Sequence, residues 1–168
     1  MINIRKRVFE TNSSSTHSIC ISKDTPIKSD TITLRRDEYG WEEGCYDLAD
    51  YFYTAVCLLK REEELMSILK ALNITPVIAN PDSKEFDDYY IDHYDECSDF
   101  VDAVLNDVDL LLRVLFSDSC VYTGNDNGSE RDDMCYCADA EYYDFDSETY
   151  IPHPGHHPDK YDYFFKGN

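Results

Sequence analysis

The chain has 168 residues, 42% of them hydrophobic, and a formal net charge of −20. A chain of this length is typical of one compact domain, so we expect residues 1–168 to fold as a single domain. The negative charge repels nucleic acid and anionic membranes, so direct binding to either is not expected, whereas basic proteins and cations are attracted. No apolar run approaches the roughly 20 residues of a membrane span, and the start of the sequence lacks an apolar export signal. We therefore expect a cytoplasmic protein whose seven cysteines are reduced thiols.

Positive and negative charges are separated along the sequence. Residues 82–150 carry 21 acidic side chains against three basic ones, a formal charge of −18. Residues 1–36 have the opposite sign, with seven basic side chains against three acidic ones. Apolar and aromatic residues are interleaved with the acids, whereas disordered acidic segments contain few of them. We therefore expect the acids to lie on a folded surface.

The first half of the chain predicts short strands followed by two helices. Residues 8–10, 18–22 and 31–34 are β-branched or alternating runs separated by turn signals, which is typical of strands. Asp47 can cap a helix that begins at Leu48, because apolar residues recur at helical spacing from there to Leu59. The same spacing predicts a second helix over residues 62–72, and residues 76–78 are typical of a strand.

The second half predicts one more helix and one strand before the pattern is lost. Residues 98–116 form a helical pattern with eight apolar residues on one side. Residues 120–123 are typical of a strand and residues 124–128 of a turn. The last forty residues lack a clear period, although their aromatic side chains can pack against the body. The expected fold is mixed α/β (α+β), a single compact domain with a small sheet, about three main helices and an irregular C-terminal segment.

The most specific segment for chemistry is residues 12–18. It reads Asn-Ser-Ser-Ser-Thr-His-Ser, so that a run of hydroxyl and amide side chains leads to His17. In a loop, these side chains and free backbone N–H groups suit a phosphate or carboxylate oxygen, and His17 could serve as the base for a serine nucleophile. A Ser-rich turn between two strands is the simpler alternative, because such turns are common.

Two further polar pairs could contribute to a site. Asp92 could orient the adjacent His93 or bind a metal, and Asp126, which follows Asn125, could be a metal ligand or a base. Each pair also has a structural interpretation. Asp92 and His93 could end a surface strand, and the Gly-Asn-Asp-Asn-Gly sequence at residues 124–128 is typical of a hairpin turn.

These segments occur together in a recognisable combination. The blocks are residues 5–18, 39–42, 90–93 and 122–127, of which the first, with Phe-Glu-Thr-Asn-Ser-Ser-Ser-Thr-His-Ser, is by far the most specific. Together they resemble a family of uncharacterised proteins encoded by phages and prophages of Gram-positive bacteria. The resemblance implies an origin in a mobile element and no established activity. It also implies a shared ligand-binding pocket formed by Asn12, Ser13, Ser14, Ser15, His17, Trp41, Asp92, His93, Asn125 and Asp126.

The C-terminal part contains side chains of the kind that bind zinc. They are Cys135, Cys137, His153, His156 and His157. One residue separates the two cysteines and the last two histidines are adjacent, which fits a tetrahedral zinc site poorly. We therefore predict that residues 153–157 are structural, and we expect no metal and no cofactor.

Two classes of function remain open from the sequence. A phage-type acidic protein could inhibit a host nucleic-acid-binding or defence protein, in the manner of an anti-CRISPR protein, by DNA or RNA mimicry. Its partner would be a basic nucleic-acid-binding protein in the cytosol of the host cell. The alternative is an enzyme or a nucleotide- or phosphate-binding protein that uses residues 12–18 with His17, His93 and Asp126. We favour mimicry because the charge extends over many residues, and the predicted acidic partner-binding surface comprises Asp87, Asp88, Asp95, Glu96, Asp99, Asp102, Asp107 and Asp109.

Overall fold

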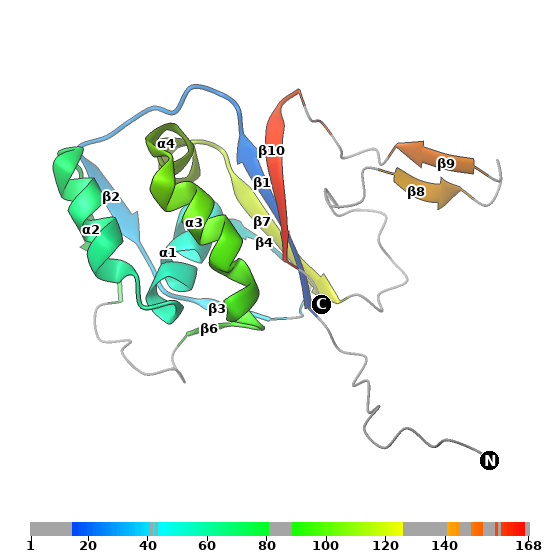
Figure 1. Ribbon diagram of the computed structural model, residues 1–168, viewed down its shortest axis with the longest axis horizontal. Helices are drawn as coiled ribbons and strands as arrows, with labels where there is room; N and C mark the ends of the chain where they lie inside the picture. Colours follow the sequence, from blue (N-terminus) through cyan, green and yellow to red (C-terminus); the bar gives the residue numbers. More distant parts are fainter. Residues whose placement is uncertain are drawn as a thin grey trace, which may run out of the picture.

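The body of the protein is an antiparallel sheet with helices packed on one face (Figure 1). A computed structural model describes residues 15–40, 42, 44–80, 89–125, 141–144, 149–152, 157 and 159–166. The sheet has four strands in the order β10-β1-β7-β4. Their bounds are β1 Ser15–Ser22, β4 Gly44–Asp47, β7 Cys120–Asn125 and β10 Tyr161–Lys166. The central strand β1 therefore pairs on both sides, with β10 and with β7.

The helices cover the face of the main sheet on which the apolar side chains of β1 and β7 lie. Ile19, Ile21 and Val121 project from β1 and β7 into the core, because successive side chains of a strand point to opposite faces. The helices that pack there are α1 (Leu48–Leu58), α3 (Ser98–Asn106) and α4 (Val108–Phe116), and the 3-10 helix η1 (Tyr94–Cys97) leads into α3. Tyr51 and Phe52 of α1 are completely buried between the layers.

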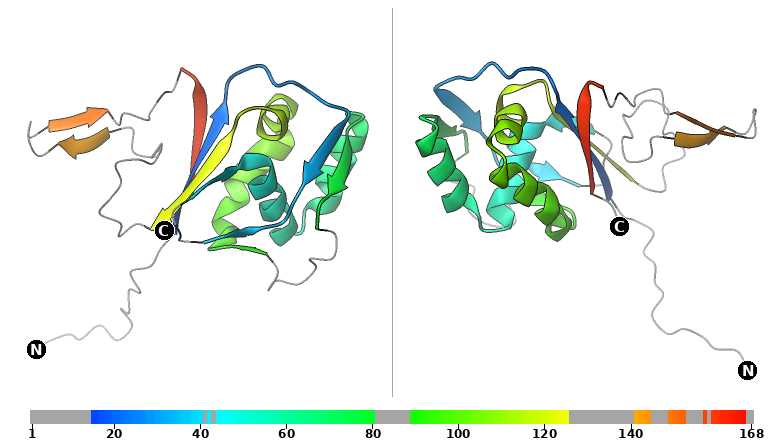
Figure 2. Two further views of the ribbon diagram at one scale, coloured as in Figure 1. Left: turned by 180° about the vertical axis from the view of Figure 1, so that it is seen from behind. Right: turned by 45° about the horizontal axis from the view of Figure 1, so that its top comes forward.

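The described residues also form three two-stranded sheets. Strand β2 (Thr31–Leu34) pairs in parallel with β5 (Thr75–Ile78), beside α2 (Glu62–Ala71) and away from the main sheet (Figure 2). Strand β3 (Glu38–Tyr39) pairs in parallel with β6 (Tyr90–Ile91). The antiparallel pair β8 (Glu141–Asp144) and β9 (Thr149–Pro152) lies on the opposite side of β10 from the helices (Figure 1). The predicted mixed α/β class is confirmed.

The elements predicted between residues 18 and 78 are confirmed with small shifts of their ends. Strand β2 has the predicted bounds, and α2 ends one residue before the predicted position. Asp47 caps α1 as expected, since its side chain accepts hydrogen bonds from the backbone N–H groups of Ala49 and Asp50. None of the helices in the described part of the chain is long and apolar enough to cross a membrane.

Two predictions about the second half were wrong. The single helix expected over residues 98–116 is two helices, because Asp107 adopts an extended backbone (φ −130°, ψ 107°) between α3 and α4. The C-terminal segment is not wholly irregular, since residues 161–166 form the edge strand β10. Burial of Phe164 against the core explains why an aromatic segment without a clear period joins the sheet. The strand expected over residues 8–10 lies outside the described residues.

Candidate functional site

A row of carboxylates covers the outer side of η1, α3 and the start of α4. From Tyr89 to Leu112 the chain has seven acidic residues and no Lys or Arg. The members of the predicted acidic surface that lie here are all exposed: Asp95, Glu96, Asp99, Asp102, Asp107 and Asp109. Asp87 and Asp88, the other two predicted members, lie outside the described residues. We call the six exposed side chains the acidic row.

The apolar side of α3 fixes the direction in which the acidic row points. Phe100, Val101 and Val104 are buried against the core, so the intervening acids of this amphipathic helix face solvent. Phe100 also packs edge-on against Phe52 of α1, with ring centroids 5.8 Å apart. The acids are therefore mounted on an anchored helix.

The spacing of the charges can be compared with that of a nucleic acid. Four acids between Asp95 and Asp102 span about 12 Å along the axis, at a rise of about 1.5–2 Å per residue. This gives about one charge per 4 Å, against 3.4 Å per phosphate along one strand of duplex DNA. The linear charge density of the row is thus close to that of a single nucleic-acid strand.

Only part of this charge is compensated within the described residues. Arg61 forms ion pairs with Asp102 and with Glu64 of α2. These two pairs raise the pKa of Arg61, chiefly through its hydrogen bond with Glu64. Asp95, Glu96, Asp99, Asp107 and Asp109 have no ion pair with any described residue. A charged partner would therefore meet mostly unpaired carboxylates.

The polar segment around His17 is a strand in its described part, so the prediction of a loop was wrong for residues 15–17. Ser15, at the start of β1, lies opposite Asn125, and His17 lies opposite Thr123. Ser15 and Thr16 pair with β7, and His17 pairs with both β7 and β10, which uses backbone groups that a loop would have left free for an anion. Ser15 and His17 are also fully buried.

Both ring nitrogens of His17 are engaged in hydrogen bonds. Nδ1 lies 2.9 Å from the Tyr51 hydroxyl, and Nε2 lies 2.9 Å from the carbonyl oxygen of Gly40. A carbonyl can only accept, so Nε2 carries a proton, and in the neutral imidazole Nδ1 accepts from the Tyr51 hydroxyl. Burial raises the pKa of the Tyr51 phenol well above its ordinary range, which keeps its proton in place. His17 is therefore unavailable as a general base.

The same hydroxyl connects His17 to the beginning of the acidic row. The Tyr51 oxygen lies 3.4 Å from the Cys97 sulfur at the end of η1. Since the Tyr51 proton points to His17, the Cys97 thiol is the donor in this contact. The buried chain Cys97–Tyr51–His17–Gly40 ties η1, α1, β1 and the end of β3 together. It positions the first turn of the acidic row.

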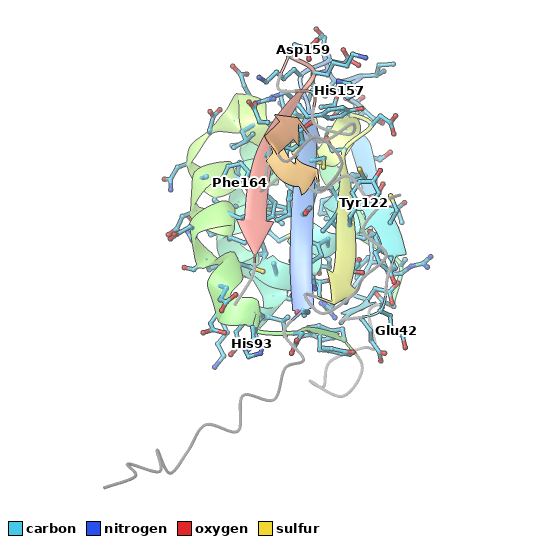
Figure 3. The ribbon with its side chains drawn as sticks, turned by 90° about the vertical axis from the view of Figure 1, so that its right-hand side faces the viewer. Glu42, His93, Tyr122, His157, Asp159 and Phe164 are labelled. Atoms are coloured by element: carbon cyan, nitrogen blue, oxygen red, sulfur yellow. The ribbon has the colours of Figure 1, made fainter. Side chains whose placement is uncertain are left out.

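Segments of all four sequence blocks meet at one end of the sheet, where β1 begins and β7 ends. The Thr123 hydroxyl donates to the Glu42 carbonyl oxygen over 2.6 Å, which brings residues 42 and 123 together. The Asp92 N–H donates to the Tyr39 carbonyl oxygen over 3.0 Å, next to the carbonyl that binds His17. Figure 3 shows Glu42 at this end of the sheet, together with His93, which follows Asp92 in the chain. His157 and Asp159 lie at the opposite end. These segments therefore lie near one another, and the shared pocket stays a prediction.

Asp92 and His93 border a shallow open depression rather than a closed pocket. Its volume is about 600 Å³, and it is lined by Glu38, Tyr90, Ile91, Asp92, His93, Tyr94 and Asp95. His93 has a left-handed backbone (φ 50°), and its Nε2 lies 3.9 Å from an Asp92 carboxylate oxygen. Three carboxylates in the lining disfavour an anionic ligand such as phosphate. Ser15 and His17 are not part of this lining.

Most of the remaining predicted site residues lie outside the part of the chain that the structure describes. Asn12, Ser13, Ser14, Trp41 and Asp126 lie outside the described residues, and Asn125 is described only in its backbone. Of the C-terminal residues that could bind zinc, His157 is exposed. The others lie outside the described residues: Cys135, Cys137, His153 and His156. In the described part of the chain, no group of His, Cys, Asp or Glu is arranged to hold a metal ion. The expected absence of a metal remains a prediction.

Sequence reasoning missed the residues that hold the polar blocks together. Tyr51 and Cys97 occupy buried positions in regular apolar patterns, so they resemble other core residues. Gly40 contributes a backbone oxygen, which has no side-chain signal. A tyrosine at a helix position surrounded by buried neighbours was the one available hint, because a buried phenol needs a hydrogen-bond partner.

The fold and the exposed carboxylates define a mixed α/β protein with an acidic helical surface. Comparison with family models, curated protein sequences and solved structures gave no match. The functional argument therefore rests on the geometry above.

Proposed function

We propose that this protein inhibits a basic nucleic-acid-binding protein of a bacterial host by presenting carboxylates in place of phosphates. The acidic row carries the proposal, because its charges are exposed, largely unpaired and spaced like those of a nucleic-acid strand. The Lys and Arg side chains of a nucleic-acid-binding groove attract such carboxylates as they attract phosphates. A host defence protein that holds DNA or guide RNA is the target class that agrees with the resemblance to phage and prophage proteins.

The rigidity of the row supports the same proposal. A disordered acidic tail loses conformational entropy when it binds, whereas carboxylates on a packed helix are already ordered. Phe100 and the contact of Cys97 with Tyr51 anchor that helix to the body. The side chains would still have to order, but the backbone would not.

A matched pair of variants tests the proposal. The row variant combines Asp95→Asn, Glu96→Gln and Asp99→Asn, and the control variant combines Asp24→Asn, Asp30→Asn and Asp118→Asn. Both triples replace exposed acids and raise the net charge by three. Each protein is immobilised and exposed to lysate of a Gram-positive host, and bound nucleic-acid-binding proteins are identified by mass spectrometry. Duplex DNA and single-stranded RNA are then added as competitors.

Mimicry predicts that a nucleic-acid-binding protein is captured by the wild type and the control variant but at least tenfold less by the row variant. The competitor nucleic acid should displace it, and binding should weaken as salt rises, because the contact is electrostatic. Equal capture by both variants, or capture that nucleic acid does not affect, would contradict the proposal.

A second candidate function is a ligand site at the end of the sheet where the polar blocks meet. The observation that favours it is the proximity of residues 15–17, 39–40, 42, 90–92 and 123–125. Calorimetric titration with inorganic phosphate, ATP and GTP tests this candidate directly. Binding that is lost in His93→Ala and kept in Lys70→Ala would support it. Absence of heat with all three probes would remove this class of ligand.

A further inference from the structure

Three cysteines lie next to one another across the main sheet. Cys20 of β1 is directly opposite Cys120 of β7, and Cys45 of β4 is opposite Tyr122, two residues along β7 from Cys120. Directly opposed residues point to the same face, as do residues two apart on one strand. The three thiols and Tyr122 therefore share the face away from the helices, where Figure 3 shows Tyr122. None of the three forms a disulfide with a described residue.

Cys45 and Cys120 are diagonal neighbours on this face, and Tyr122 adjoins both of them in the strand register. The two thiols and the Tyr122 hydroxyl are close enough to influence one another's pKa. Cys45 is exposed, Cys120 is partly buried and Cys20 is buried. An oxidant in solution therefore meets Cys45 first, with Cys120 beside it.

The other described cysteines lack this arrangement. Cys97 is buried against the Tyr51 hydroxyl, and Cys57 lies beside the Arg36 guanidinium. Burial is the main cause that raises the pKa of Cys57, so this thiol holds its proton. Cys57 is only partly buried and faces an ion-paired arginine, which makes it a suitable control for nonspecific oxidation.

We propose that Cys45 and Cys120 form an oxidation site, at which a peroxide converts the two thiols into a reversible disulfide between β4 and β7. The Cys45 thiolate attacks one peroxide oxygen, the O–O bond breaks, and the departing hydroxide takes up a proton to give water. The resulting Cys45 sulfenic acid is attacked by the Cys120 sulfur. The S–O bond then breaks, and the second hydroxide takes the Cys120 proton and leaves as water. Two electrons pass from the thiols to the peroxide in total.

Strand geometry implies that this disulfide is easily reduced. Diagonal neighbours across an antiparallel pair have Cα atoms about 7–8 Å apart, slightly beyond the usual limit of about 6.8 Å for a disulfide. The edge strand β4 must therefore shift towards β7. A strained, exposed disulfide has a higher reduction potential than a structural one, so mild thiols should reopen it.

The environment of Cys45 also sets the pH dependence of the reaction. Burial of part of its surface and the neighbouring Cys120 raise the pKa of Cys45 above its ordinary value of 9.0. The thiolate is the reactive form, so most molecules are unreactive at neutral pH. Oxidation should therefore be slow at pH 7 and faster at pH 9.

Peptide mapping of the full-length protein tests the proposal. The protein is treated with equimolar hydrogen peroxide at pH 7 and pH 9, the remaining thiols are alkylated, and the unreduced protein is digested with trypsin. The expected product joins the peptide of residues 37–60 to that of residues 114–131 with the loss of two hydrogen atoms. It should form faster at pH 9 and disappear with dithiothreitol. Because the first peptide also contains Cys57, the Cys57→Ser variant must still give the cross-link, whereas Cys45→Ser must not.

Other cross-links or products would overturn the proposal. A disulfide between Cys20 and Cys120 in the wild type would assign the site to the directly opposed pair. If Cys45 is still fully available for alkylation after peroxide treatment at pH 9, it is not the oxidised thiol. If it is oxidised to sulfinic acid without a cross-link, Cys120 does not form a disulfide with it. A cross-link that survives in Cys45→Ser would have the same consequence.

Discussion

The Tyr51 hydroxyl has two polar neighbours in a region that is otherwise apolar. It donates to His17 and accepts from Cys97, and it is completely buried. A buried polar group that loses its partner retains the full cost of desolvation, whereas a satisfied one contributes a modest net stabilisation. The hydroxyl thus makes burial of His17 in the sheet energetically acceptable.

We expect Tyr51→Phe to lower the free energy of unfolding by about 1–3 kcal/mol, because it leaves His17 Nδ1 buried without its donor. Urea unfolding followed by circular dichroism measures the change. Tyr46→Phe is the control, since the Tyr46 hydroxyl has no hydrogen bond to any described residue. We expect that change to stay within about 0.5 kcal/mol. Equal destabilisation by both variants would argue against a special role for the chain of hydrogen bonds.

At the scale of single elements, Asp107 decides where one helix ends and the next begins. Its side chain accepts hydrogen bonds from the N–H groups of Asp109 (2.9 Å) and Leu110 (3.1 Å), which satisfies the start of α4. An aspartate that caps a helix takes an extended backbone, so it cannot also continue the preceding helix. The separation of α3 from α4 follows from this one side chain.

We expect Asp107→Ala to destabilise the protein by about 1 kcal/mol through loss of the cap. Asp107→Asn should be nearly neutral, because asparagine caps as well as aspartate does. Thermal unfolding of the three proteins in one buffer measures both effects. If the asparagine variant were as unstable as the alanine variant, the charge of Asp107 and not its cap would be responsible.

Strand β10 is held to the rest of the protein by an ion-pair cluster at Asp162. Its carboxylate oxygens lie 2.7 Å from Arg113 of α4 and 3.2 Å from Lys23, which follows β1. Burial alone would raise the pKa of Asp162, but the hydrogen bonds from Arg113 and Lys23 outweigh it and place the pKa below its ordinary value of 3.8. The ionised form is therefore favoured in the folded state.

This lowered pKa predicts a specific acid sensitivity. A group whose folded pKa lies below its unfolded pKa contributes stability above the unfolded value and loses it as the pH falls through the folded value. We expect wild type to be more stable than Asp162→Asn above about pH 4 and the difference to vanish below that range. Urea unfolding between pH 2.5 and 7 measures it, with Asp159→Asn as an exposed control in the same region. A difference that persisted at the lowest pH would show that the contact does not depend on ionisation.

Local signals account for the elements that the sequence predicted, and long-range contacts account for those it did not. The cap at Asp47 and the spacing of apolar residues in α1 and α2 lie within a few residues, so the sequence was sufficient. The apolar pattern continues across Asp107, which concealed the break, although Asn106-Asp107 is itself a cap signal that could have revealed it. The pairing of β1 with β10 and the burial of His17 depend on residues far away in the chain. A polar strand and a polar loop have the same composition, so the sequence could suggest which blocks lie near one another but could not predict that residues 15–17 form a strand.

The acidic row lies in a stretch of the chain that carries only negative charges. The seven acids between Tyr89 and Leu112 have no Lys or Arg among them, and Arg61 of α2 is the cation paired with this surface in the described residues. Like charges on one helix face repel one another, which lowers the stability of the free protein. A surface that binds a basic partner well is therefore expected to be strained in the partner's absence.

This repulsion predicts that salt stabilises the free protein. The Debye length falls from about 30 Å at 0.01 M to about 8 Å at 0.15 M ionic strength, so repulsion between neighbouring acids weakens over this range. We expect the melting temperature to rise by a few degrees between these two sodium chloride concentrations, corresponding to about 1 kcal/mol. Choline chloride should have the same effect if screening is the cause, whereas a larger effect of sodium would indicate site binding.

The row variant should be more stable than the control variant at low salt, and its melting temperature should rise less with added salt. Both variants lose three negative charges, but the row variant loses them from acids that lie close together, whereas the control variant loses them from acids that lie apart. A melting temperature that fell with salt, or an equal response of the two variants, would show that the acidic row is not a centre of repulsion.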